Sequence, residues 1–433
     1  LGMYRMQVHD CRSTGMHWQI GKGGGFHYAA AEAGGQALPA TVFLGGPPAL
    51  MLAAIAPLPE NVPELMLASL VAGQRLPVVD NVGPHRLIGT AEFALMGSVA
   101  PNVRRSEGPF GDHYGYYSLA HDYPVFSVEQ IAHRKDAIYP ATVVGKPRQE
   151  DFFIGDLLQE LLSPLFPLVM PAVVDLWSYG ETGYHSLGAA VVRQRYEREA
   201  MASAFRILGE GQLSLTKFLL VTDQPVDLRN FRETLVHLLQ RTHPETDLYV
   251  FSNLSMDTLD YTGPEVNKGS KGVWLGLGPA VRQLPQEFRS SELPYGVSTV
   301  GVFCPGCLVV DAPAYAEEPN VGARIAKAEV FKDWPLIVIS DEPERALSSV
   351  INFLWTTFTR FEPAADIYAS RTEVVRHHVS YSSPVVIDAR MKSSYPDELS
   401  CRPDIARKVT DRWTEYFSGS VVEMGDSEKA SLT

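Results

Sequence analysis

The sequence predicts an α+β protein in which a first domain of short strands is joined by a helix to a second, α/β domain. Up to about residue 125, short apolar runs alternate with glycine-rich turns, which is typical of short strands. Residues 151–168 then carry apolar side chains at helical spacing, and Pro167 and Pro171 end the pattern. Beyond residue 172, strand-like runs alternate with helical ones, as expected of an α/β domain.

The composition is that of an ordinary globular protein. The chain has 433 residues, 45% hydrophobic and 20% charged, which is enough for two large domains. Its formal net charge of −13 argues against binding to nucleic acid or anionic membrane, because an acidic surface repels phosphate. Four cysteines in a chain of this length do not make a disulfide framework.

The sequence also bears on location. The apolar run at residues 49–58 is too short to cross a bilayer, and no charged segment followed by an apolar core marks a secretory signal. We therefore expect a cytoplasmic protein without stable membrane insertion. The chain begins Leu1-Gly2-Met3, with no initiator methionine and no helix-start signal, which we interpret as an N-terminal truncation.

The first domain, residues 1–150, is predicted to contain short strands and two helices. Residues 40–44 have the composition of a buried strand, and the Gly-Gly-Pro-Pro after them is a turn. Helices are predicted at 48–56 and 62–72, each with a proline near its start, where the missing N–H costs little. Residues 125–144 are predicted to form a pair of strands with a connector.

The rest of the chain divides into a linker helix at 151–172, a second domain at 173–420 and a disordered polar tail at 421–433. The predicted strands of the second domain are 173–176, 188–192, 218–222, 247–251, 297–303, 308–310 and 336–339. Its predicted helices are 195–208, 228–240, 321–331 and 342–361. We expect this domain to mediate oligomerisation.

The strongest chemical motif is the segment 107–117, in which Glu107 and Asp112 flank a Gly-Pro-Phe-Gly turn before a tyrosine-rich stretch. Glycines permit a tight backbone and proline stiffens it. Such a turn could hold two acids near one another, which pushes their pKa values apart so that one can donate a proton. A glycine loop with solvated acids is the alternative interpretation.

This segment resembles the Glu-Gly-Pro-(Phe/Tyr)-Gly-(Asp/Glu) motif of the UbiD family, which are decarboxylases that depend on prenylated FMN. Further blocks resemble that family in the same order, at residues 2–7, 14–19, 22–25, 44–49, 57–64, 138–145 and 216–218. The resemblance implies a UbiD-like fold. A split-β-barrel flavin-binding domain, here partial, would be joined by a helix to the α/β domain.

The resemblance also implies a catalytic group of Arg5, Glu107 and Asp112 and the cofactors prenylated FMN, Mn²⁺ and K⁺. The cofactor would act as electron sink while the protein manages positions and protons. Arg5 would hold the substrate carboxylate or the cofactor, since its planar fork suits either. Asp112 would protonate the carbon that carbon dioxide leaves, and Glu107 would keep Arg5 and Asp112 in the right charge states.

The cofactor-binding residues that the resemblance implies are Met3, Tyr4, Arg5, His17, Trp18, Gln19, Lys22, Gly23 and Lys217. His17 and Glu64 would bind the metal, because imidazole and carboxylate suit manganese. A third ligand, an asparagine, is expected immediately before Leu1. Lys22 and Lys217 would contact the cofactor phosphate, and a solvated lysine is the alternative for Lys217.

One further motif, Cys304-Pro305-Gly306-Cys307, is a lone pair of cysteines between two strand-like runs. Without a second pair it is weak evidence for zinc, and a turn explains it better than a redox pair. The glycines at 21–25 lack the spacing and the surrounding βαβ unit of a dinucleotide-binding loop.

The predicted function is the reversible, non-oxidative decarboxylation of an aromatic or conjugated carboxylic acid. Residues 353–367 and 386–392 resemble UbiD relatives that act on hydroxyarenes and menaquinone-pathway decarboxylases, which leaves a hydroxybenzoate or a naphthoate as substrate. A flavin prenyltransferase would supply the cofactor, and the chain would form homo-oligomers. A non-catalytic member of a multi-chain UbiD-type carboxylase is the alternative. An ordinary flavin oxidoreductase is disfavoured, because no nicotinamide-binding motif is present.

Overall fold

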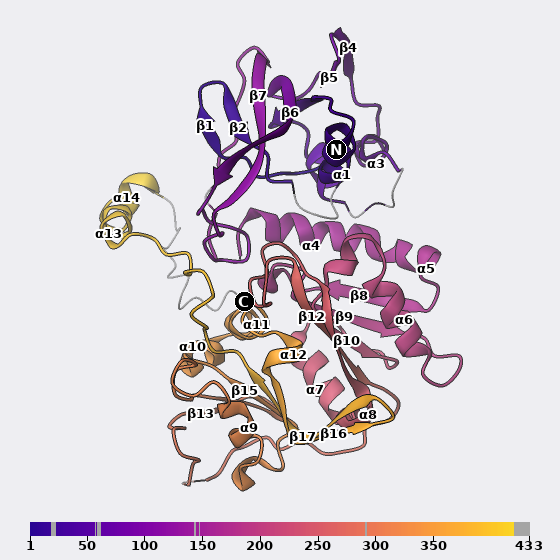
Figure 1. Ribbon diagram of the computed structural model, residues 1–433, viewed down its shortest axis with the longest axis vertical. Helices are drawn as coiled ribbons and strands as arrows, with labels where there is room; N and C mark the ends of the chain where they lie inside the picture. Colours follow the sequence, from indigo (N-terminus) through magenta and orange to yellow (C-terminus); the bar gives the residue numbers. More distant parts are fainter. Residues whose placement is uncertain are drawn as a thin grey trace.

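The computed structural model describes residues 1–18, 23–56, 58, 62–142, 144–146, 148–290 and 292–419. Two predicted cofactor-binding residues, Gln19 and Lys22, lie outside these ranges, as does the tail predicted at 421–433. Figure 1 shows the amino-terminal domain at one end of the molecule, helix α4 (Glu150–Leu162) across the middle, and the carboxyl-terminal half at the other end.

The amino-terminal domain is built on one antiparallel sheet of five strands in the order β1-β2-β7-β6-β3. Its strands are β1 (Val8–Asp10), β2 (Ser13–Gly15), β3 (Leu38–Leu44), β6 (Phe93–Glu107) and β7 (His121–His133), with a separate hairpin of β4 (Val78–Val82) and β5 (His85–Ile88). Its helices are α1 (Gly23–Ala33), α2 (Pro48–Ile55) and α3 (Glu64–Val71). The long β6–β7 pair and the loop between its strands carry the candidate catalytic acids.

The prediction of two strands within residues 125–144 is wrong. One strand, β7, begins earlier and ends at His133, and it pairs with β6 and β2. The described residues from 134 to 142 form no strand. Pro140 explains part of this, because it has no N–H to donate to a ladder.

Two five-stranded sheets make up the carboxyl-terminal half, in the orders β11-β12-β10-β9-β8 and β13-β14-β15-β17-β16. The first contains β8 (Val173–Ser178), β9 (Leu187–Val192), β10 (Phe218–Thr222), β11 (Leu248–Ser255) and β12 (Lys268–Gly276), with helices α6 (Glu199–Leu208), α7 (Phe231–Arg241) and α8 (Pro244–Asp247). The second contains β13 (Val300–Cys304), β14 (Cys307–Val310), β15 (Leu336–Ile339), β16 (Ile367–Val375) and β17 (His378–Asp388), with helices α9 (Val321–Ile325), α10 (Pro343–Ser348), α11 (Val350–Phe358) and α12 (Pro363–Asp366). The chain continues into α13 (Pro403–Asp411) and α14 (Trp413–Tyr416).

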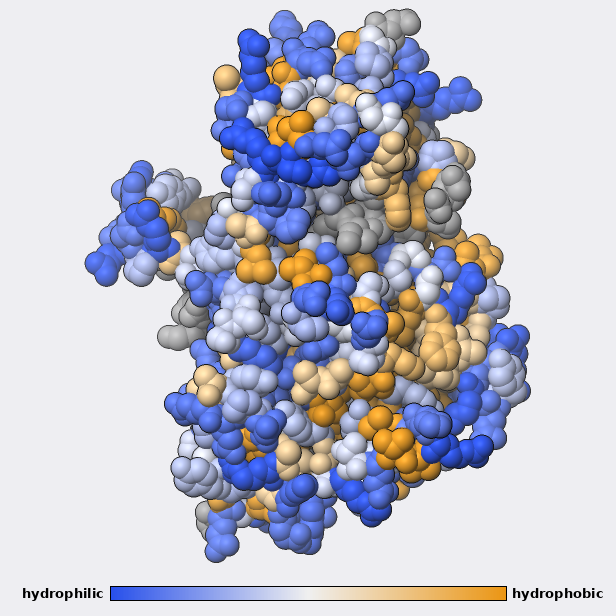
Figure 2. Space-filling view, in the orientation of Figure 1, coloured by the Kyte–Doolittle hydropathy of each residue, from blue (hydrophilic) through white to orange (hydrophobic). Residues whose placement is uncertain are grey.

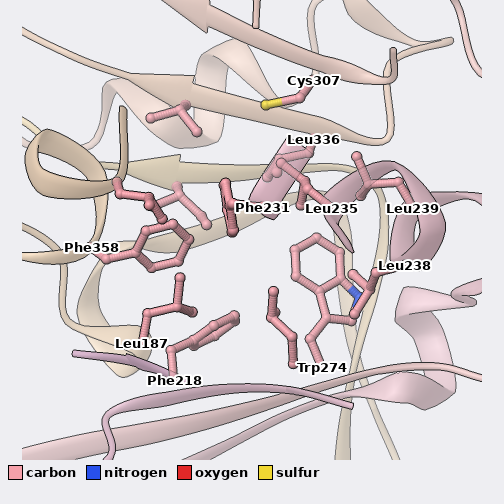
Figure 3. Packing of buried hydrophobic residues seen from close by; sticks show 14 of the residues in the cluster. Leu187, Phe218, Phe231, Leu235, Leu238, Leu239, Trp274, Cys307, Leu336 and Phe358 are labelled. Atoms are coloured by element: carbon pink, nitrogen blue, oxygen red, sulfur yellow. The ribbon is translucent and has the colours of Figure 1, made fainter. Parts of the chain in front are cut away.

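One shared hydrophobic core joins these two sheets. Phe218 of β10, Phe231 of α7 and Phe358 of α11 pack together with Leu336 of β15, as Figure 3 shows. Cys307 lies at the edge of the same cluster. The hairpin that joins β13 to β14 confirms the interpretation of the cysteine pair as a turn. Because the sheets share their core, the carboxyl-terminal half presents one rigid surface to the first domain.

The helix predicted at 342–361 is divided into α10 and α11 by Ser349. Its backbone is extended (φ −158°, ψ 163°), and its hydroxyl accepts a hydrogen bond from the N–H of Asn352. Serine favours such a cap over the interior of a helix, because its side chain competes for backbone groups.

The linker is a continuous helical segment, Glu150–Val169, made of α4, a 3₁₀ turn (Ser163–Leu165) and α5 (Phe166–Val169). By length and composition alone it could cross a membrane, and only 11% of its apolar window is buried in the protein. Figure 2 shows apolar residues gathered at the level of α5, where Leu168 is 78% exposed.

Candidate active site

Asp112 lies on the loop between β6 and β7, which we call the catalytic loop (Gly108–Ser118), and Glu107 is the residue of β6 that precedes this loop. Glu107 ends β6 opposite His121, the first residue of β7, so the sheet fixes where the loop begins. Gly108 follows with φ +93°, a left-handed conformation that favours glycine. Glu107 and Asp112 are each only 1% exposed, so the interpretation of this segment as a loop with solvated acids is wrong.

The carboxylate of Glu107 is surrounded by His17, by Gly15 of β2 and by Tyr123 of β7. Its Oε1 is 3.3 Å from His17 Nδ1, and the His17 ring lies against Tyr123 with a centroid distance of 4.3 Å. A Cβ on Gly15 would stand 2.0 Å from the other carboxylate oxygen, so only glycine fits there. Burial raises the pKa of Tyr123 to about 12, and the charge of Glu107 adds to the shift.

Asp112 is held by the backbone of its own loop. The N–H of Tyr114 donates to Oδ1 at 2.7 Å, and the N–H of Asp112 donates to the carbonyl of Tyr116 at 3.0 Å. The other oxygen, Oδ2, is buried and has no hydrogen-bond partner among the described residues. Burial raises the pKa of Asp112 to about 7, although the Arg5 cation opposes the shift. This carboxyl therefore exchanges a proton near neutral pH.

Arg5 brings a positive charge to both acids. Its Nη1 donates to the carbonyl of Gly111 at 3.0 Å, and its guanidinium lies 4.5 Å from the centre of the Phe110 ring. Burial lowers the pKa of Arg5, while the negative charges of Asp112 and Glu107 oppose that shift. The structure thus brings the three predicted catalytic residues into one electrostatic group.

Residues of the carboxyl-terminal half complete the site, and the sequence did not single them out. Asp257, which is 2% exposed, adds to the rise in the pKa of Asp112, and it lies 3.7 Å from His185. The hydroxyl of Tyr261 accepts a hydrogen bond from the N–H of Leu119 at 3.2 Å. These residues lie far along the chain from the catalytic loop, so no local pattern could have marked them.

Several predicted cofactor-binding residues surround the start of α1. The hydroxyl of Tyr4 accepts from the N–H of Gly24 at 2.8 Å, and Trp18 meets Tyr4 edge-on with a centroid distance of 6.4 Å. Met3 is 49% exposed, and a Cβ built on Gly23, the first residue of α1, would meet no atom within 4 Å. Aromatic faces beside open glycine backbone suit a flavin and its phosphate.

The two predicted metal ligands have different neighbours in the structure. Glu64 begins α3 and pairs with the α-amino group of Leu1 at 3.3 Å, whereas the ion pair of His17 is with Glu107. Among the described residues, no group of three or more His, Cys, Asp or Glu could hold a metal ion.

Lys217 is buried within the carboxyl-terminal half. It is 1% exposed, its Nζ lies 2.8 Å from Asp260 Oδ2, and Thr262 accepts from it at 3.3 Å. Burial lowers the pKa of Lys217. The alternative of a solvated lysine is therefore wrong, and the contact with a cofactor phosphate stays a prediction.

Comparison with known families assigns the chain to a class. Residues 1–147 match the 3-octaprenyl-4-hydroxybenzoate carboxy-lyase Rift-related domain, and residues 152–276 match the 3-octaprenyl-4-hydroxybenzoate carboxy-lyase C-terminal domain. The chain therefore belongs to the UbiD family of carboxy-lyases, which confirms both the resemblance and the α+β fold.

Individual relatives agree with this assignment. A Chlamydia pneumoniae protein, named as one of the subunits of a 4-hydroxybenzoate decarboxylase, is 52% identical over 418 residues, which are 96% of this chain and 71% of that protein. The closed form of vanillic acid decarboxylase from Sedimentibacter hydroxybenzoicus matches with a TM-score of 0.61 and 26% identity, over 68% of this chain and 63% of that one. The UbiD-class enzyme HmfF from Pelotomaculum thermopropionicum in complex with FMN shares the fold, with a TM-score of 0.56 and 22% identity over 68% of this chain and 65% of that one.

Asp112→Asn is expected to change how stability depends on pH. The carboxyl has an ordinary pKa of 3.8 but holds its proton up to about pH 7 in the fold. Between those values the folded state binds more protons than the unfolded state. The stabilising contribution is therefore complete below the unfolded pKa and is lost as pH rises through the folded pKa.

Thermal unfolding of both proteins at about pH 5 and about pH 8 measures this effect. The unfolding midpoint of the variant, relative to that of the parent, should be higher at the alkaline pH. Asp151 and Asp156, whose pKa values burial raises to about 6, are present in both proteins and cancel in the comparison. A difference between the midpoints that does not vary with pH would show that Asp112 titrates normally.

Proposed function

We propose that this protein decarboxylates an aromatic or conjugated carboxylic acid without net oxidation, using prenylated FMN and Asp112 as proton donor. The observation that carries the proposal is the group of the buried acids Glu107 and Asp112 and the half-buried Arg5, in which the pKa of Asp112 is raised to about 7. The names of two relatives, one from a 4-hydroxybenzoate decarboxylase and one a vanillic acid decarboxylase, favour a hydroxybenzoate-type substrate over a naphthoate.

Each residue of the group has a part in the reaction. Prenylated FMN, when bound, supplies the electron sink for the bond that breaks between the ring carbon and the carboxyl group. Arg5 orients a negatively charged group near the loop backbone that it already contacts at Gly111. Asp112 carries a proton on Oδ2, the oxygen that lacks a partner among the described residues, and delivers it to the ring carbon. Glu107 balances the charge of Arg5.

The products are carbon dioxide and the arene that carries hydrogen in place of the carboxylate, so one proton is consumed in each turnover. Asp112 regains its proton from solvent. A pKa near 7 lets the carboxyl both donate its proton and take up a new one near neutral pH. In the reverse direction the same carboxylate accepts the proton that the arene loses. The proposed reaction is therefore reversible in principle.

The proposal includes a site for the cofactor phosphate and its metal in the first domain. Tyr4, Trp18 and Gly23 would border the flavin, and His17 and Glu64 would hold Mn²⁺, with K⁺ as a second ion. A flavin prenyltransferase supplying the cofactor, a homo-oligomer and a cytoplasmic location complete the proposal.

The decisive experiment is to express the chain together with a flavin prenyltransferase and to record its absorbance spectrum and intact mass. The same preparation is then assayed for release of carbon dioxide from 4-hydroxybenzoate, vanillate and a hydroxynaphthoate. Bound prenylated flavin with turnover of one acid is the expected result. Rapid reduction of the bound flavin by NADH would instead indicate an oxidoreductase and contradict the proposal.

A second candidate is a protein that assembles with other chains of a UbiD-type carboxylase without catalysing the reaction itself. It is favoured by the name of the Chlamydia pneumoniae relative, which describes one part of a multi-chain decarboxylase. The buried catalytic group argues against a purely structural role, because burying charged groups costs stability. A flavin-free protein in the same expression test would favour this candidate.

Glu64→Gln is expected to abolish the binding of metal and flavin. The change removes the negative charge that a divalent cation requires but keeps the size of the side chain. Flavin content is read from absorbance and manganese from elemental analysis, so the test does not depend on turnover. Glu60, four residues before Glu64 in the sequence, gives a matched control as Glu60→Gln. Normal flavin content in Glu64→Gln would exclude Glu64 as a metal ligand.

A further inference from the structure

The catalytic loop belongs to the first domain in sequence, but its tyrosines are buried against the carboxyl-terminal half. Tyr114 is 2% exposed and Tyr116 is 5% exposed, and they form one hydrophobic cluster with Leu259 and Trp355. Trp355 lies on α11, in a part of the chain beyond residue 276, where the match to the family domains ends. The contact between Trp355 and the catalytic loop therefore involves a residue outside the part of the chain that the family domains describe.

Trp355 makes two kinds of contact with the loop. Its indole N–H donates to the carbonyl of Tyr114 at 2.7 Å, and its ring stacks on Tyr116 with a centroid distance of 5.2 Å and an interplanar angle of 20°. The N–H of the same residue, Tyr114, donates to Asp112 Oδ1. Trp355 thus fixes the residue that orients the proposed proton donor.

Arg360, about one turn after Trp355, holds the other side of the loop. It is 1% exposed, its Nε donates to the hydroxyl of Tyr116 at 3.2 Å, and it forms an ion pair with Glu398. The hydroxyl of Tyr116 also lies 2.8 Å from Thr359 Oγ1. Charge-assisted bonds of this kind, when buried, are strong and directional.

Backbone hydrogen bonds close the arrangement. The N–H of Tyr117 donates to the carbonyl of Asp397 at 2.9 Å, and the N–H of Leu399 donates to the carbonyl of Gly115 at 2.9 Å. Glu398 lies between these two bonds, opposite Tyr116, and also pairs with Lys146 at 2.9 Å, near the linker. Residues of the carboxyl-terminal half therefore contact four consecutive residues of the loop, Tyr114 to Tyr117.

We propose that Trp355 and Arg360 are positioning residues for the proton donor: they anchor Tyr114 and Tyr116 so that Asp112 Oδ1 stays bound to the loop and Oδ2 stays available. The inference rests on the proposed function, in which Asp112 delivers a proton. Both residues lie in a segment that the family domains do not cover. The inference gives this segment a part in the geometry of the reaction. Neither residue touches the reacting atoms in this scheme.

The test replaces Trp355 by phenylalanine, which keeps an aromatic ring against Tyr116 but removes the N–H donor. Hydrogen exchange of the full chain is followed peptide by peptide by mass spectrometry, which requires no turnover. Exchange in residues 108–118 should become roughly tenfold faster, the effect of leaving one buried carbonyl without its donor. The rest of the protein should exchange as before.

Trp334→Phe is the matched control, because Trp334 is also buried (4% exposed) but lies in a separate core cluster. Where wild-type turnover is measurable, Trp355→Phe should lower kcat by about tenfold and change KM by less than about twofold, since substrate binding is untouched. A KM that rises with unchanged kcat would overturn the inference. So would unchanged exchange in the loop, or exchange that quickens equally throughout both variants.

Tyr116→Phe provides a second, milder variant in case Trp355→Phe does not fold. It removes the hydroxyl that contacts Arg360 and Thr359 and leaves the stacked ring in place. The same local rise in exchange is expected at 108–118, and a loop unaffected by this change would also overturn the inference. If the parent protein showed no decarboxylation at all, the exchange result would still decide whether the anchor exists, so the two failures are distinguishable.

Discussion

Asp112→Asn is expected to lower the rate of decarboxylation by about 10²–10⁴-fold, the usual contribution of a general acid, while flavin binding stays intact. Asparagine has the size of aspartate, and its carbonyl oxygen can keep the hydrogen bond from Tyr114 that now goes to Oδ1. It has no proton of suitable acidity to give to carbon. The measurements are kcat from carbon dioxide release and flavin content from absorbance.

The pH profile provides an independent check on the same residue. Because the pKa of Asp112 is raised to about 7, the protonated form that donates declines as pH rises through that value. Decarboxylation should therefore fall on the alkaline side with an apparent pKa near 7. Asp122→Asn, a change at an exposed aspartate of β7, should retain both the rate and the profile. Loss of flavin from Asp112→Asn, or activity within tenfold of the parent, would contradict the assignment.

Local chemistry explains which parts of the site the sequence could predict. Glu107 and Asp112 flank one segment whose glycines and proline are recognisable in any chain, so their place at the connection between β6 and β7 follows from the motif. The raised pKa of Asp112 comes from burial and from Asp257, not from Glu107 as the motif suggested. Arg5 is about a hundred residues away, and only the family resemblance placed it with them. The electrostatic group in the structure agrees with that placement.

The missed contributors share a different property, because each reaches the catalytic loop across a domain boundary. Trp355 donates to a carbonyl 241 residues earlier in the chain, and Asp257 acts on Asp112 from a loop after β11. In sequence Trp355 belongs to an apolar helix, where an aromatic residue is most simply a core residue. Nothing in its local pattern reveals that the indole N–H points outward to another domain.

Secondary structure also divides into parts that local sequence determines and parts that distant contacts determine. Strands such as β10, buried on all five residues, are continuous apolar runs that the sequence predicts well. The boundaries that failed depend on single hydrogen bonds, as at Ser349, or on the partner strand, as at the end of β7. Such details are settled by tertiary context rather than by local propensity.

Arg5→Met is expected to destabilise the protein by about 1–3 kcal/mol, because the carbonyl of Gly111 loses its donor and the buried Glu107 loses the charge of a nearby cation. Glu107 is 1% exposed, and neither of its carboxylate oxygens has a hydrogen-bond partner among the described residues. The negative charge of that carboxylate acts on the guanidinium of Arg5, although less strongly than the charge of Asp112 does. The variant should also lose turnover, because Asp112 is held in the same field.

The double variant Arg5→Met with Glu107→Gln tests whether the loss is electrostatic. If the charge of Glu107, no longer balanced by Arg5, causes the instability, neutralising it should recover stability, and the double variant should be more stable than Arg5→Met alone by about 0.5–3 kcal/mol. Urea unfolding at neutral pH measures the stability of the four proteins of this double-mutant cycle: the parent, Arg5→Met, Glu107→Gln and the double variant. Turnover should stay absent in the double variant, because the fork that orients the substrate is gone. Penalties that simply add would mean that Arg5 stabilises the fold through packing on Phe110 rather than through the charge of Glu107.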